Sequence, residues 1–175
     1  MKRLSVIGKI FFLILITVYG LQTTGCGFRP MYGENSETPV GVEDQLGQVE
    51  LGNIPNREGQ YLRNALIDRF YRDGRPSEPR YILNISDITE GLTDLDITKT
   101  ADATRGQLRL SAGMTLIDVR AHELVLQRTL VSITSYNKLG SEFATRVTEE
   151  NARRNALDDL ARQVEMQAAL YLKRQ

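Results

Sequence analysis

Three places in the chain hold residue types that could do catalytic chemistry. Residues 94–98, Asp-Leu-Asp-Ile-Thr, have the D-x-D-x-T spacing that can serve phosphoryl transfer. That chemistry needs the carboxylates at the end of a buried parallel strand followed by a crossover helix, whereas this segment lies in a long antiparallel connection. His122 has no partner at motif spacing, and Asp158 and Asp159 would point about 100° apart on a helix. We therefore expect no enzymatic activity.

The composition excludes two further classes of function. One Cys and one His among 175 residues cannot build a Cys/His zinc site. The 22 basic and 22 acidic residues balance, and removing Lys2, Arg3 and Lys9 from the N-terminus leaves 19 against 22, a net charge of −3. There is thus no basic excess for nucleic acid. We expect no metal, no cofactor and no nucleic-acid partner.

Residues 1–25 have the pattern of a secretory signal peptide. Two basic residues, Lys2 and Arg3, precede an apolar run from Ile10 to Tyr19, and small residues follow it at positions 23–25. The run is shorter than the roughly 20 apolar residues of a membrane-spanning helix, although an uncleaved anchor is the alternative.

The only cysteine, Cys26, directly follows this signal. Its setting resembles the lipobox of bacterial lipoproteins, with Thr23 where Leu is usual. That resemblance implies a diacylglycerol and a fatty acyl chain on Cys26, which would become the first mature residue; a buried free cysteine is the alternative. Gly27 rather than Asp follows it, which implies delivery to the outer membrane. Such acyl chains would hold the chain on the membrane.

Hydrophobic spacing organises the rest of the chain. Residues 26–47 are expected to be the lipidated N-terminus and a linker with prolines and glycines, and residues 48–175 one domain. Alternation and helical spacing predict, in order, a strand at 49–54, a helix capped by Asn56 and ending near Phe70, a strand at 80–88, a strand near 105–116, a strand at 124–136 and a helix at 141–172.

Two details of these elements remain to be placed. Leu92, Leu95 and Ile97 could extend the second strand past a bulge at Gly91. On the last helix, i,i+4 ion pairs are expected for Glu149/Arg153, Glu150/Arg154 and Asp158/Arg162.

The order β-α-β-β-β-α predicts an α+β fold. Both helices are amphipathic and can cover one face of a sheet. We expect a two-layer sandwich of a four-stranded, mostly antiparallel sheet with two helices on one face, leaving the other face free.

Four basic residues are candidates for binding an anion. Arg105 and Arg109 share the polar face of their strand, and Lys138 and Arg146 flank the start of the last helix. If the hairpin and the helix start lie close together, the four would form a basic cluster able to hold phosphates, such as those of a membrane glycolipid. The alternative is that they are ordinary solvated charges, with Arg146 paired to Glu142 or Glu150.

An ordered set of short strings resembles the LptE family of lipopolysaccharide-assembly lipoproteins, in its compact proteobacterial form. The strings are Cys26–Gly33 after the signal, Arg63–Leu66, Ala103–Arg105, Leu116–Val119, Ser135–Asn137, and Ala152–Arg154 leading to Leu160–Ala161.

This resemblance implies a role at the outer membrane. Family members place two helices against a four-stranded sheet and lie on the periplasmic side, inside the lumen of the LptD β-barrel. They help that barrel assemble and bind lipopolysaccharide on its way to the outer leaflet. The family's suspected lipid contacts lie near Arg105 and Arg146 of this chain. A lipoprotein pilot or adaptor for another envelope complex is the alternative function.

Overall fold

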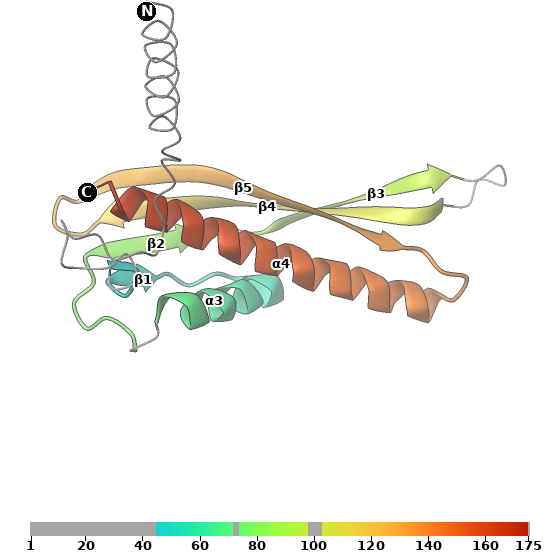
Figure 1. The fold of residues 1–175 in the computed structure, drawn as a ribbon, viewed down its shortest axis with the longest axis horizontal. Coiled ribbons are helices and arrows are strands. Elements are labelled where there is room, and N and C mark those ends of the chain that lie inside the picture. The colour runs from blue at the N-terminus through green and yellow to red at the C-terminus, as the bar shows by residue number, and fades with distance from the viewer. Residues whose placement is uncertain (1–44, 72–73, 98–102, 175) are drawn as a thin grey trace, which may run out of the picture. The chain divides into compact units, whose positions relative to one another are not determined.

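The computed structural model describes residues 45–71, 74–97 and 103–174 (Figure 1). The predicted signal, Cys26 and most of the linker therefore lie outside the described residues. Seven elements follow in chain order: β1 (Val49–Leu51), α3 (Asn56–Phe70), β2 (Tyr81–Ile85), β3 (Thr89–Ile97), β4 (Ala103–Asp118), β5 (Glu123–Asn137) and α4 (Glu142–Leu172). The predicted α+β class is confirmed.

Strand β4 is the centre of the sheet. It pairs antiparallel with β5 along its whole length, while β3 and β2 share its other edge, β3 beside its first half and β2 beside its last five residues. Strand β1 then pairs with β2, in the sheet's one parallel ladder among the described strands. The sheet is therefore mixed but mostly antiparallel, as predicted.

The sheet has five strands because the predicted second strand is divided. Pairing with β4 stops at residues 86–88, where Ser86 instead exchanges two hydrogen bonds with Gly113: its N–H donates to the Gly113 carbonyl at 2.8 Å, and its Oγ accepts from the Gly113 N–H at 2.7 Å. The bulge predicted at Gly91 was wrong, since Gly91 pairs in register with Arg109. The alternation of apolar residues indicated the residues of both β2 and β3, but it did not indicate that the strand is interrupted between them.

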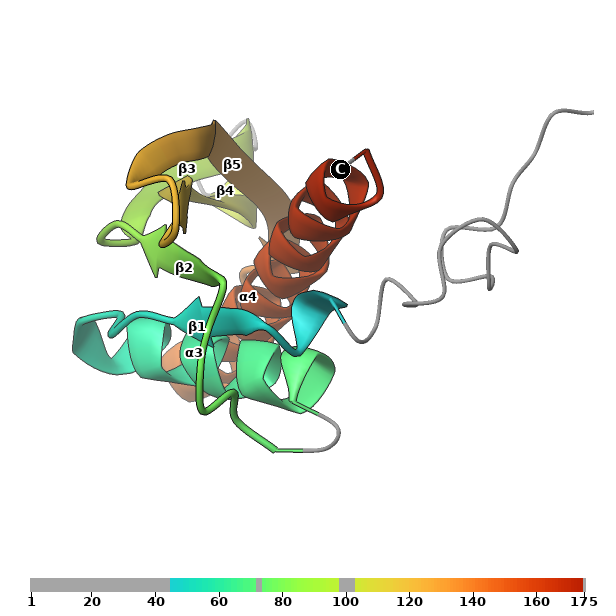
Figure 2. The ribbon, with the colours of Figure 1, turned by 90° about the vertical axis from the view of Figure 1, so that its left-hand side faces the viewer.

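The two helices and one sheet face enclose the core. Helix α4 packs along β5 and β4, and α3 packs on α4 and β1 (Figures 1 and 2). The even-numbered side chains of β4 from Leu108 to Leu116 are at most 4% exposed, and they meet the apolar stripe of α4 that includes Leu160 and Val164. At about 25 cal/mol per Å² of buried apolar area, this contact is the main stabilising term.

Both helices lie where they were predicted, but the N-cap predicted for the first helix was wrong. Ser141 caps α4, its side chain accepting from the Ala144 N–H at 3.5 Å. Asn56 does not cap α3: the cap residue is Pro55, no side-chain hydrogen bond is made there, and Asn56 has a positive φ of 69°. Asn tolerates this left-handed conformation better than most residues, which accounts for its place at this turn.

The ion pairs of α4 were predicted correctly except for one. Glu149–Arg153 at 2.8 Å and Glu150–Arg154 at 3.5 Å are present. Arg162 instead pairs with Asp159 at 3.3 Å. Asp158 accepts a hydrogen bond from the Tyr61 hydroxyl at 3.2 Å and so links α4 to α3.

Substitution of Gly106 tests how closely β4 and β5 pack. A Cβ at Gly106 would lie 2.4 Å from the ring of Tyr136, whereas a Cβ at Gly91 on β3 would meet nothing within 4 Å. Gly106→Ala is expected to lower the free energy of unfolding by about 1 to 3 kcal/mol, because the buried Tyr136 must move. Gly91→Ala is the matched control and should change it by less than about 0.5 kcal/mol in urea unfolding. Equal effects of the two variants would contradict the packing described.

Candidate functional site

One face of the sheet is not covered by either helix. It is formed by the odd-numbered positions of β4 and by the residues paired with them in the neighbouring strands, and we call it the open face. Its residues on β4 are Arg105, Gln107, Arg109, Ser111, Gly113, Thr115 and Ile117. Their partners are Thr89, Gly91, Thr93 and Leu95 on β3, Ile82 and Asn84 on β2, and Leu124, Gln127, Thr129, Val131, Ile133, Ser135 and Asn137 on β5.

The charge of the open face has one sign around β4. None of these positions on β2 to β5 is Asp or Glu, and their only ionised residues are Arg105 and Arg109, both exposed; the nearest carboxylate on the same face is Glu50 of β1, which pairs with Ile82 beside the opposite end of β4. Hydroxyl and amide side chains surround them, with Ile133 paired to Arg109 and 51% exposed. Four residues apart on a strand, the two arginines are about 13 Å apart along it. The open face is therefore a local cationic surface on a chain that is acidic after its N-terminal segment.

Strand β4, strand β5 and the start of α4 meet at the same end of the domain. The Lys138 N–H donates to the Thr104 carbonyl at 2.9 Å, and the Thr148 hydroxyl donates to the Asn137 carbonyl at 2.8 Å. Thr145 also bonds the backbone of Leu139. The hairpin and the helix start thus lie close together, which was the condition for a basic cluster.

Lys138 and Arg146 each have a carboxylate partner on the covered side of the sheet. The ammonium group of Lys138 bonds Asp94 on β3, and this hydrogen bond raises the pKa of Lys138. Arg146 pairs with Glu142 at 2.8 Å, one of the two partners expected for it, and both side chains are more than three-quarters exposed. Exposed pairs of this kind contribute little stability and exchange readily with a stronger anion.

On the covered side of the sheet, Arg153 of α4 binds three glutamates and so links β3 to α4. The guanidinium of Arg153 donates two hydrogen bonds of 2.8 Å to Glu90, one of 2.8 Å to Glu149 and one of 3.0 Å to Glu150. The bonds from Arg153 hold the pKa of Glu90 below its usual value and raise the pKa of Arg153. The sequence showed the contact with Glu149, but nothing local indicates Glu90, which is 63 residues away.

The residues considered for catalysis do not form a catalytic arrangement in the part of the chain described. Asp94 is the partner of Lys138, and His122 lies in an exposed turn with a φ of 56°. Within the described ranges, no group of three or more His, Cys, Asp or Glu could hold a metal ion. No helix among these residues is long and apolar enough to cross a membrane.

Comparison with known proteins identifies the family. The model of the LptE family, described as lipopolysaccharide-assembly, matches residues 46–168. The chain belongs to the LptE family. The match spans all seven elements, except for the last four residues of α4, and so includes the whole open face. The family is one of lipopolysaccharide assembly rather than of catalysis. No curated protein sequence matches the chain.

Solved structures show the same fold at low sequence identity. A protein assigned as a lipoprotein in Caulobacter crescentus has a TM-score of 0.59 at 22% identity, covering 75% of this chain and 95% of that one. Rare lipoprotein B from Shewanella oneidensis has a TM-score of 0.58 at 8% identity, covering 72% of this chain and 95% of that one. A minor lipoprotein from Acinetobacter baumannii has a TM-score of 0.54 at 24% identity, covering 70% of this chain and 91% of that one. At these identities the likeness shows the fold alone.

Removing Arg153 should weaken the attachment of β3 to α4. Arg153→Gln leaves three carboxylates close together, so we expect a loss of about 1 to 2 kcal/mol in the free energy of unfolding at pH 7. Because the pKa of Glu90 is lowered in the folded state, the wild-type ion pair contributes fully above the ordinary glutamate pKa of about 4.3 and is lost as the pH falls through the lowered value.

The matched control is the neighbouring Arg154→Gln. Arg154 is more exposed and makes one 3.5 Å contact with Glu150, so its loss should change stability by less than about 0.5 kcal/mol. Urea unfolding at pH 7 and at pH 3.5 measures both variants. The difference in the free energy of unfolding between Arg153→Gln and the wild type should be smaller at the lower pH. A difference that does not change with pH would contradict the role given to Glu90.

Proposed function

We propose that this LptE-family chain is an outer-membrane lipoprotein that binds lipopolysaccharide and occupies the lumen of an LptD-type β-barrel. The observation that carries the lipid-binding part is the pair of exposed arginines on one face of β4, among hydroxyl and amide side chains. Lipopolysaccharide is a phosphorylated glycolipid, and guanidinium groups hold phosphates through paired, charge-assisted hydrogen bonds. The surrounding hydroxyl and amide groups suit hydrogen bonding to sugars.

The four basic residues have different parts in this proposal. Arg105 and Arg109 make the primary phosphate contacts, because both are exposed on the same face of β4. Lys138 and Arg146 lie at the same end of the domain but on the covered side, and they add contacts around the edge of the sheet by exchanging Asp94 and Glu142 for the ligand. The primary site is thus on β4, and the other two cations have a secondary part.

The barrel partnership and the membrane anchor rest on separate arguments. A wide outer-membrane barrel has a polar lumen, and a domain with a polar open face and mixed charge suits such an environment. Acylation at Cys26, followed by the linker up to residue 47, would let the domain enter the lumen while it stays anchored. This places the chain on the periplasmic side of the outer membrane. A pilot or adaptor for another envelope complex is the second candidate, favoured if the open face binds protein instead.

The double variant Arg105→Ala with Arg109→Ala tests the lipid site. It should weaken lipopolysaccharide binding by roughly tenfold or more. A hydrogen bond to a charged group contributes about 1.5 to 3 kcal/mol, and a tenfold change in affinity corresponds to about 1.4 kcal/mol. Lys138→Ala with Arg146→Ala should weaken it less. The control is Arg128→Ala on β5, whose guanidinium bonds the Gln127 carbonyl and lies off the open face. Binding is measured with the purified full chain and labelled lipopolysaccharide; equal affinity of the first variant and the control would refute the site.

A further inference from the structure

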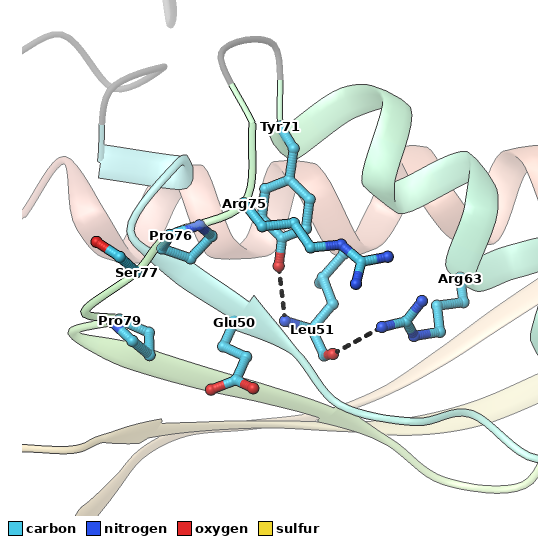
Figure 3. Close-up of a pocket in the computed structure, with 8 residues that line it drawn as sticks. All are labelled: Glu50, Leu51, Arg63, Tyr71, Arg75, Pro76, Ser77 and Pro79. Carbon is cyan, nitrogen blue, oxygen red and sulfur yellow. Dashed lines mark hydrogen bonds between the residues drawn. The ribbon is translucent and has the colours of Figure 1, made fainter.

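A small pocket lies at the outer edge of β1, away from the four basic residues of the proposed lipid site. It has a volume of about 180 Å³ and is bounded by β1, by α3 and by the segment before β2 (Figure 3). Pro76 and Pro79 form part of its wall, and their fixed φ angles limit the motion of that segment. The pocket is therefore a defined cavity rather than a gap between mobile side chains.

The backbone groups along this edge are already bonded by side chains. The Tyr71 hydroxyl donates to the Val49 carbonyl at 3.0 Å and accepts from the Leu51 N–H at 2.9 Å. Arg63 Nε donates to the Gly52 carbonyl at 3.2 Å. These bonds close the edge to a further strand and fix the guanidinium of Arg63 in place. They also give a structural reason for the Arg63–Leu66 string noted in the sequence.

Two guanidinium groups converge in the pocket. The side chains of Arg63 and Arg75 extend toward one another from opposite sides, while the carboxylate of Glu50 points away from both (Figure 3). Neither arginine forms an ion pair with any described carboxylate. Arg63 Nη2 donates to the Leu51 carbonyl at 3.5 Å, and Arg75 makes no hydrogen bond to the described residues. Because an arginine has five N–H donors, several donors of the pair remain available for a ligand. Two like charges brought together in this way favour a bound anion.

We propose that this pocket binds a phosphate group, held between Arg63 and Arg75. Two guanidinium groups match the charge and the several oxygens of a phosphate, and the cavity is too small for a large ligand to enter whole. The phosphate is therefore either free or the exposed headgroup of a lipid. The inference does not depend on the proposed function, because it uses none of Arg105, Arg109, Lys138 and Arg146.

Titration calorimetry of the full chain in neutral detergent and phosphate-free buffer tests this site. In an Arg105→Ala, Arg109→Ala background, which removes the proposed lipid site, sodium phosphate should bind saturably to one site, and adding Arg75→Gln should weaken the binding by roughly tenfold. Arg75 is exposed and makes no bond to the described backbone, so its loss should leave the fold intact, as circular dichroism can verify. Arg75→Lys should retain part of the affinity, and the control Arg128→Gln should retain all of it.

A second titration with micelles containing phosphatidic acid separates the two sources of the phosphate. Binding of both probes through Arg75, or of the micelles alone, supports a lipid headgroup. Binding of inorganic phosphate alone through Arg75 supports a free phosphate. The proposal is overturned if neither probe binds, or if Arg75→Gln and Arg128→Gln bind both probes equally.

Discussion

The alternation of β4 is the constraint on which the rest of this structure depends. Its even-numbered side chains are buried against the helices, so the odd-numbered ones must face the other way. A shift of one residue in its register would place Arg105 and Arg109 in the core and expose the leucines, at a cost no surface contact could offset. The hydrophobic core thus fixes where the two arginines are, although neither arginine contributes to it.

The charges of the domain are sorted between its two sides. On the covered side, carboxylates of β3 and α4 meet Arg153 and Lys138 and hold the edge of the sheet to the helix. On the open face, the ionised residues of β4 and its described neighbouring strands are Arg105 and Arg109. A net charge close to zero therefore conceals a surface suited to anions, and composition alone gives a misleading expectation of how this chain meets phosphorylated ligands.

Much of the fold could be predicted because it follows from local periodicity. The leucine alternation of β4 and the helical stripe of α4 were sufficient for both elements and for the hairpin with β5. The break at Ser86 was missed because it is produced by pairing with Gly113, which no local pattern encodes. The same holds for Glu90 with Arg153 and for the convergence of Arg63 with Arg75. Alternation along β4 was enough to place Arg105 and Arg109 on one face, whereas contacts between residues far apart in the sequence could not be predicted from local patterns.

Purification of the lipidated chain from outer membranes in mild detergent tests the central claim most directly. If the chain fills the lumen of a barrel, as proposed, it should be recovered with one large β-barrel protein in equal amounts, and the pair should bind lipopolysaccharide. Recovery of the chain alone, or with a secretin or another envelope complex and no such barrel, would contradict the account.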